Sequence, residues 1–272
     1  MKRPQYLERP EITPAERGLI DAVVAAPDDR APRLVYADYL LARTEPEVRA
    51  RGELIATQCK LDDLLHDAPA DLRTREHELL DRYGRTWTAW LGFAGPRWNV
   101  EFRGGFMEYV DLHATNLAIA SRLFTTEPVR RLVIEEPTRD ATKLLEMVWL
   151  ARLHTFGVRA AVYGLAPQAV VMSPHLANIT GLVLEYSSLA EIDLGHLVGL
   201  RELSVARNRF STVDAFAALP LRTLDLSNNP IDVTSVTKLC AMQLERLDVR
   251  NCPISADGIE RLRERYGHAL LT

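Results

Sequence analysis

Histidine spacing and glycine-rich loops are the first features of this sequence that could indicate chemistry. A zinc hydrolase typically carries two histidines four residues apart on one helix face, and a nucleotide-binding protein carries a glycine-rich loop whose amides hold phosphate. Neither pattern occurs, and Arg103-Gly104-Gly105, the nearest approach to such a loop, is interpreted as a tight turn that leads into a strand. The sequence therefore predicts no metal and no cofactor. The histidines considered are His66, His77, His113, His154, His175, His196 and His268.

Cys59 is a candidate nucleophile, because a cysteine thiolate attacks electrophiles readily. It falls on the apolar face of a predicted helix, in line with Leu54 and Ile55, so we expect a buried, unreactive thiol. The other cysteines, Cys240 and Cys252, are distant in the sequence. An odd number of widely spaced cysteines argues against a disulfide framework or a zinc site.

Asp38 stands beside the aromatic Tyr39 in a predicted helix. It could contact a partner, but we favour a structural role, because a carboxylate among core aromatics normally requires a hydrogen-bonding partner such as Arg33 or Arg51. Packing in the core and at a domain junction is likewise expected for Trp87, Trp90 and Trp98.

The stretch from Leu221 to Ile231, LRTLDLSNNPI, has the pattern of a strand followed by a turn, and elements of this kind would position the functional residues of the chain. Leu224 and Leu226 alternate across Asp225 as the inward residues of a strand, and Asn229 can bond the backbone of the following turn. The pattern resembles the leucine-rich repeat, L-x-x-L-x-L-x-x-N/C-x-L, whose units are roughly 20 to 29 residues long. Similar strand starts recur at spacings of 22, 24, 26, 21, 21 and 23 residues: Met107, Val129, Leu153, Ile179, Leu200, Leu221 and Leu244.

The repeats grow more regular toward the C-terminus. Pro137 and Ala161 stand where Asn or Cys is expected, so the early strands keep the pattern while their turns depart from it. Met107 opens either a true repeat or a capping strand. After the last repeat, SADGIERLRERYG predicts a helix capped by Ser255 or Asp257 that covers the end of the core.

Outward side chains of the repeats supply the candidate site. Parallel strands lie about 4.8 Å apart, so residues at equivalent positions line up into tracks. Acidic and basic side chains are mixed on these tracks with an aromatic side chain. This mixture favours a protein or peptide partner over a polyanion or a small apolar ligand. For any single residue, a merely solvated face is the alternative. The predicted contact residues are Glu185, Tyr186, Arg207, Asp225, Arg246, Asp248 and Arg250.

Four helices are predicted ahead of the repeats. Thr13-Pro14-Ala15-Glu16 has the pattern of a capping box with proline at the first helical position, and the helix should end before Pro27. A second helix should end at about Arg43, and a third should follow Pro46. A fourth should run from about Ala70 to Tyr83. This region resembles the bacterial repeat-companion domain, a small helical module found beside leucine-rich and other repeats, and the resemblance implies no reaction. The matching stretches are AAPDDRAPRLVYADYLLAR, RGELIATQCKL, ELLDRYGRTWTAWL and EFRGGF.

The sequence thus predicts an α/β fold: a leader (1–12), a small all-helical domain (13–98) and a leucine-rich-repeat solenoid (99–272) of about seven repeats. Strands should line its concave face, with short helices or turns on the convex face. A formal net charge of -4 gives no general attraction to nucleic acid or to anionic membranes. The polar N-terminus and the absence of an apolar run of roughly 18 residues predict a cytoplasmic protein. We expect it to be monomeric when no partner is bound.

These features favour a non-enzymatic scaffold that binds a protein or peptide partner on the concave face. Two alternatives stay open. One is a regulatory or inhibitory subunit of a specific enzyme, such as a small GTPase or a protease. The other is an enzyme with a site at the junction of the two domains, near Trp87 to Phe106.

Overall fold

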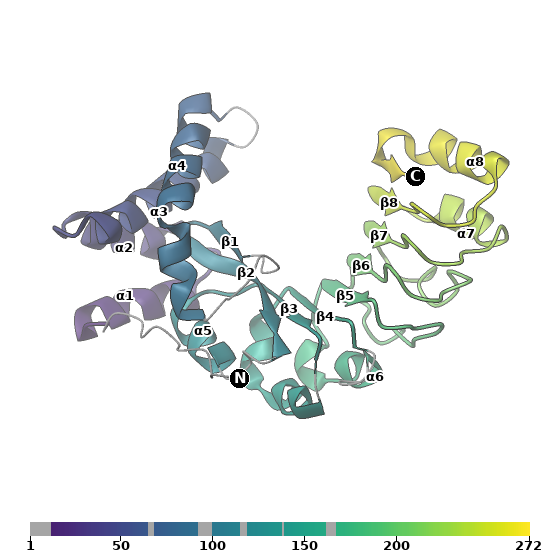
Figure 1. Cartoon of the computed structure of the whole chain (residues 1–272), viewed down its shortest axis with the longest axis horizontal. Coiled ribbons are helices and arrows are strands. Elements are labelled where there is room, and N and C mark those ends of the chain that lie inside the picture. The colour runs from purple at the N-terminus through teal and green to yellow at the C-terminus, as the bar shows by residue number, and fades with distance from the viewer. Residues whose placement is uncertain (1–11, 65–67, 92–99, 115–118, 138, 162–166) are drawn as a thin grey trace, which may run out of the picture. The chain divides into compact units, whose positions relative to one another are not determined.

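The chain packs into two compact units, Met1–Asp111 with Thr115–Val129, and Leu112–Ala114 with Arg130–Thr272. The computed structural model describes residues 12–64, 68–91, 100–114, 119–137, 139–161 and 167–272 (Figure 1). Of the expected leader, residues 1–11 lie outside the described residues. The expected domain boundary at residue 98 differs from this division, because residues 100–111 and 119–129 pack with the N-terminal helices.

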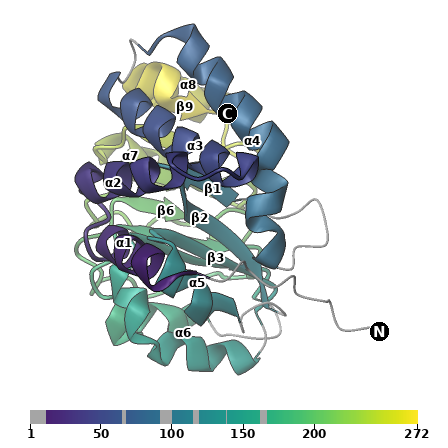
Figure 2. The same cartoon turned by 90° about the vertical axis from the view of Figure 1, so that its left-hand side faces the viewer.

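Helices dominate the first unit, but it also contains a hairpin. Helices α2 and α3 lie against one another, as Figure 2 shows, and α5 packs on α1. The described elements within the expected domain 13–98 are all helical, and the hairpin of β1 and β2, which pair antiparallel, follows it in the same unit. The elements are α1 (Pro14–Ala25), α2 (Arg30–Leu41), α3 (Pro46–Leu64), α4 (Ala70–Thr88), the 3-10 turn η2 (Ala89–Leu91), β1 (Val100–Arg103), β2 (Phe106–His113) and α5 (Ala120–Thr126).

Local sequence signals explain where these elements begin. The hydroxyl of Thr13 accepts a hydrogen bond from the amide of Glu16 at 3.2 Å, as the capping pattern predicts. The carboxylate of Glu16 instead accepts the hydroxyl of Tyr36 at 2.8 Å, which ties α1 to α2. At the hairpin turn, Gly104 and Gly105 have positive φ, and a Cβ at Gly105 would lie 2.1 Å from the side chain of Ile55. Only glycine fits this turn.

Arg33, which is buried, and Arg51, which is half-buried, fix the hairpin and the end of α5 to the helices. Arg33 pairs with Glu108 at 2.5 Å, and Arg51 pairs with Glu127 at 3.4 Å. Asp38 was expected to be buried and to pair with one of these arginines. It is exposed on α2, so that expectation is wrong. A carboxylate in water needs no protein partner, and the two guanidinium groups are neutralised by glutamates from the hairpin and the segment after α5.

The second unit is a parallel sheet whose strands follow one another in chain order (Figure 1). The strands are β3 (Arg131–Glu135), β4 (Thr155–Arg159), β5 (Gly181–Glu185), β6 (Glu202–Ser204), β7 (Thr223–Asp225), β8 (Arg246–Asp248) and β9 (Leu270–Leu271). Short helical segments connect them or follow them: η4 (Arg139–Glu146), η5 (Val148–Arg152), α6 (Pro167–Val171), η6 (Pro174–Leu176), α7 (Ser235–Ala241), α8 (Ala256–Tyr266) and η7 (Gly267–Ala269).

Met107 lies in β2, which the glycine turn folds back antiparallel on β1 and which directly precedes β3 in the strand order. Its residues up to Asp111 belong to the first unit. At the other end, β9 adds a parallel strand that the sequence pattern did not predict. The strands predicted from Val129 to Leu244 are all present.

Helix α8 covers the last repeat as predicted. Ser255 caps it by accepting the amide of Gly258 at 3.2 Å. Leu262 and Tyr266 are buried on its inner face, and the hydroxyl of Tyr266 donates to the carbonyl oxygens of Leu239 and Met242. These bonds join the helix to the end of α7.

Candidate functional site

The outward side chains of β6, β7 and β8 line up in register. Ser204, Asp225 and Asp248 occupy the same register position on these three successive parallel strands. The neighbouring inward residues, Leu224 and Leu247, are fully buried. Burial of the leucines on one side therefore holds the polar residues on the other side in fixed positions.

Buried asparagines set the turns that follow β6 and β7. Asn208 accepts the amides of Ser187 and Leu189 at 3.0 and 3.1 Å and donates to the carbonyl of Leu184 at 2.6 Å. Asn229 forms the equivalent bonds one repeat later, accepting the amide of Phe210 at 3.1 Å. Each carboxamide thus links its own turn to the preceding repeat.

A residue in the left-handed backbone conformation follows every strand from β3 to β8. At the first five of these positions, the amide donates to a carbonyl oxygen of the next repeat. The first of these bonds joins Glu136 to Arg159 at 2.9 Å, and the last joins Asn228 to Arg250 at 2.8 Å. The early turns therefore keep the regular backbone although Pro137 and Ala161 replace the asparagine. The residues, with φ between 49° and 58°, are Glu136, Ala160, Tyr186, Arg207, Asn228 and Asn251.

Tyr186 and Arg207 are two of the four members of this left-handed row that are not asparagine. Asparagine tolerates the conformation, and it occupies the last two positions, whereas tyrosine and arginine are strained there. The guanidinium carbon of Arg207 lies 4.7 Å from the centre of the Tyr186 ring, and the tyrosine is 47% exposed. The two side chains form an exposed stacked pair at the end of β5 and β6.

Glu185 belongs to a bridged network. Arg159 donates to Glu135 at 2.8 Å and to Glu185 at 2.7 Å, across three neighbouring strands. The other carboxylate oxygen of Glu185 accepts the hydroxyl of Ser204 at 2.7 Å. The Glu185 side chain is only 19% exposed, so it is positioned for one geometry rather than freely mobile.

Asp225, Asp248 and Arg250 form a second charged group. Asp248 is 3% exposed and pairs with the exposed Arg250 at 2.5 Å, and this bond raises the pKa of the arginine. Asp225 is half-buried and accepts the amide of Ser227 at 2.9 Å. A shallow depression of about 240 Å³ runs along β5 to β8 and is lined by Glu185, Ser204, Asp225, Arg246 and Asp248, among others.

The middle of the early strands offers no comparable polar surface. Val133 and Val183 are buried, and Gly157 between them is covered, since a Cβ there would lie 2.5 Å from the Cβ of Val183. The polar face therefore begins at the C-terminal ends of β3 to β5 and widens toward β8.

The candidate nucleophile lies elsewhere and is enclosed. Cys59 is 3% exposed in the core of the first unit, packed with Ile55 and Phe106, and burial raises the pKa of its thiol. Two of the described histidines contact neighbouring repeats: His113 lies 3.3 Å from Glu136, and His196 lies 2.7 Å from the carbonyl oxygen of Val171.

Comparison with protein families identifies the repeating unit. Two leucine-rich repeat family models match residues 220–242 and 242–262, which include β7, α7 and β8. Residues 220–262 of the chain are therefore leucine-rich repeats. No curated protein matches it. Among the described residues, none of the helices combines the length and apolar character needed to cross a bilayer.

The structure places the seven predicted residues in two groups on the leucine-rich repeats. Glu185, Tyr186 and Arg207 lie at the ends of β5 and β6, and the other four lie on or directly after β7 and β8. Sequence reasoning missed the Arg159 bridge and the strained backbone. A signal for the bridge existed, because Glu135, Arg159 and Glu185 occupy the same repeat position with alternating charge.

Proposed function

We propose that this leucine-rich repeat protein is a non-enzymatic scaffold that binds a protein or peptide partner on the strand face of its second unit. Leucine-rich repeats generally mediate protein–protein interaction. The strand face would be the concave side of a solenoid, with the short helices on the convex side. The first unit would be a repeat-companion domain of a bacterial, cytoplasmic protein.

The strained and exposed pair Tyr186 and Arg207 is the observation that carries this proposal. A left-handed backbone costs an ordinary residue about 1–2 kcal/mol. Asparagine would relieve much of that strain, as at Asn228 and Asn251. An exposed cation–π contact returns only about 0.5–1 kcal/mol. Local strain that stability does not explain is typical of functional positions.

Rigid presentation would be the mechanism. Inward leucines and the buried asparagines hold the strand ends, so the outward side chains lose little conformational freedom when a partner binds. The aromatic–guanidinium pair supplies a large contact area, and the charged residues of both signs orient a polar partner. Glu185, Tyr186, Arg207, Asp225, Arg246, Asp248 and Arg250 would make the contacts.

The test is a surface double variant, Tyr186→Ala with Asp225→Arg. A partner is first isolated by affinity purification from the native cell with the full chain as bait, and its affinity for the purified chain is then measured. We expect the double variant to keep its melting temperature and to lose binding. The matched control is Val198→Ala with Asp214→Arg, which alters exposed residues away from the strand face. Normal binding by the first variant would contradict the proposed surface.

A regulatory or inhibitory subunit of one enzyme would use the same face, and no structural observation favours it over a general scaffold. A single stoichiometric partner in the purification would distinguish it. The alternative of an enzyme site near Trp87 to Phe106 falls partly on residues 92–99, which lie outside the described residues.

A further inference from the structure

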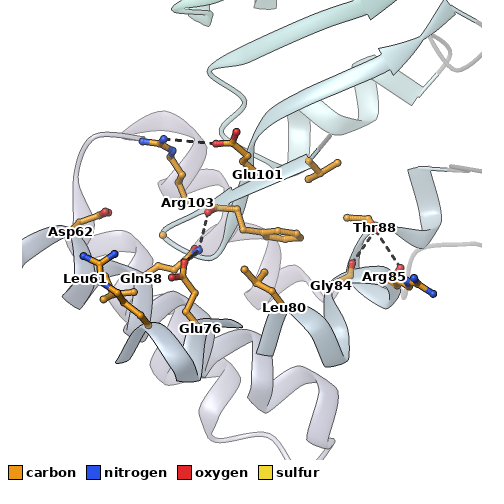
Figure 3. Close-up of a pocket in the computed structure, with 14 residues that line it drawn as sticks. Gln58, Leu61, Asp62, Glu76, Leu80, Gly84, Arg85, Thr88, Glu101 and Arg103 are labelled. Atoms are coloured by element: carbon orange, nitrogen blue, oxygen red, sulfur yellow. Dashed lines mark hydrogen bonds and ion pairs between the residues drawn. The ribbon is translucent and has the colours of Figure 1, made fainter. Parts of the chain in front are cut away.

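A groove of about 940 Å³ lies beside strand β1 in the first unit. We propose that it binds an extended peptide segment of a partner protein, which adds to β1 as a further strand. All four residues of β1 line the groove, and α4 lines it with Leu80, Gly84 and Thr88 (Figure 3). An edge strand facing a helix across a groove is a geometry that captures peptides by strand addition.

The backbone of β1 is the first argument for a peptide. Among the described strands, β1 lies at the edge of its sheet and pairs with β2 alone. An edge strand presents amide and carbonyl groups that a further strand can bond. The groove therefore lies where such a strand would lie.

Gln58 shows that this part of the hairpin bonds an amide. Its Nε2 donates to the carbonyl oxygen of Phe102 at 2.8 Å (Figure 3). Its Oε1 accepts the amide of Gly105 at 2.7 Å. The buried side-chain carboxamide thus bonds the hairpin with one donor and one acceptor, and its Nε2 also donates to the carboxylate of Glu76 at 2.7 Å. Toward Val100 and Glu101 the groove continues, and a peptide backbone can occupy it there.

The side chains of the groove define the chemistry of the peptide. Half-buried Leu61, Leu80 and Phe102 offer apolar contacts to one side of an added strand. The charged lining is balanced, which disfavours a polyanion or an anionic bilayer and suits a peptide with apolar residues and charges of both signs. The charged residues are Asp62, Arg73, Glu76, Arg85, Glu101 and Arg103.

Gly84 makes a specific test possible. A Cβ added at this helical glycine would meet no atom within 4 Å, so a larger side chain enters open space without strain. Gly18 on α1 has the same property and lies outside the groove lining. Leucine is a better helix former than glycine, so Gly84→Leu and Gly18→Leu should both fold and should have equal or higher melting temperatures.

The probe is a displayed library of random short peptides, selected on the full chain. We expect enriched peptides whose affinity falls at least about tenfold with Gly84→Leu and stays unchanged with Gly18→Leu. Methylating the peptide's backbone nitrogens one at a time should abolish binding at alternate residues only, because a strand turns every second amide toward its neighbour.

Two results would overturn the proposal. One is a selection in which every enriched peptide binds the Gly84→Leu and Gly18→Leu variants equally well. This includes a selection whose peptides lose affinity only for the variant Tyr186→Ala with Asp225→Arg, since they would bind the strand face instead of the groove. The other is a peptide that is sensitive to Gly84→Leu but tolerates every single N-methylation, since the groove would then be filled without strand addition.

Discussion

The side-chain Nδ2 of Asn229 lies 2.9 Å from the carbonyl oxygen of Val205, at the end of the preceding repeat. The same nitrogen donates to the carbonyl of Leu226 in its own turn, also at 2.9 Å. Because Asn229 is 1% exposed, water cannot replace it, and these backbone groups depend on one side chain. Adjacent repeats are joined by this polar link as well as by their leucines.

Asn229→Ala should therefore destabilise the protein by about 2–4 kcal/mol, because it leaves several buried backbone groups without a partner. Urea unfolding followed by circular dichroism measures this. Asn251→Gly is the control: Asn251 is exposed and left-handed, glycine adopts that conformation freely, and the change should stay within about 0.5 kcal/mol. Equal effects of the two substitutions would show that the buried bonds contribute nothing.

The double variant Tyr186→Asn with Arg207→Asn should be more stable than the natural protein by about 1 kcal/mol, since relief of left-handed strain exceeds the lost cation–π contact. It should also lose the partner. Ala160→Gly relieves the same strain where no contact is proposed, so it should raise stability and leave binding intact. Calorimetric melting and binding titration of both variants give the answer. Lower stability of the double variant would mean that the two side chains serve the fold.

Leu224→Asp should unfold the second unit, because Leu224 is fully buried between repeats and an unpaired carboxylate there costs at least about 4 kcal/mol. Thr223→Asp changes the adjacent, outward position and should shift stability by roughly 0.5 kcal/mol or less. The comparison is made by thermal melting. A folded Leu224→Asp protein would contradict the assignment of Leu224 to the core.

Arg159→Met should destabilise the protein by about 1–3 kcal/mol, because Glu135 and Glu185 lose the cation that bridges them. Adding Glu135→Gln and Glu185→Gln to Arg159→Met should restore part of the loss, since the two carboxylates then no longer repel. Urea titrations of the single and triple variants measure the coupling. A triple variant less stable than Arg159→Met would contradict the bridge.

Stability should fall at alkaline pH through Cys59. Burial raises the pKa of its thiol, so the folded protein holds this proton more tightly than the unfolded chain does. The contribution is complete below the pKa of an unfolded thiol, roughly 8.5, and is lost as the pH rises through the folded value. The free energy of unfolding should therefore decrease above about pH 8, and less steeply in Cys59→Ala. Parallel pH profiles of the two proteins would exclude this role.

Periodicity alone was sufficient to predict much of this fold. The spacing of Leu203, Leu224 and Leu247 placed three strands, because an alternating apolar pattern has one stable arrangement once it repeats along the chain. Capping residues such as Thr13 and Ser255 placed helix starts for the same local reason. The candidate residues also followed from the pattern, because the positions that alternate with the inward leucines of a strand face outward.

Tertiary structure decided what depends on contacts between distant residues. Met107 matched a repeat, yet the glycine turn pairs its strand with β1, and the carboxylate of Glu127 accepts the Met107 amide at 2.9 Å within the first unit. The stacking of Tyr186 on Arg207, the Arg159 bridge and the groove beside β1 join residues that no local pattern relates. Sequence period determined which residues face outward; the backbone conformation at each turn and the partners brought across strands determined which of them are strained, paired or exposed.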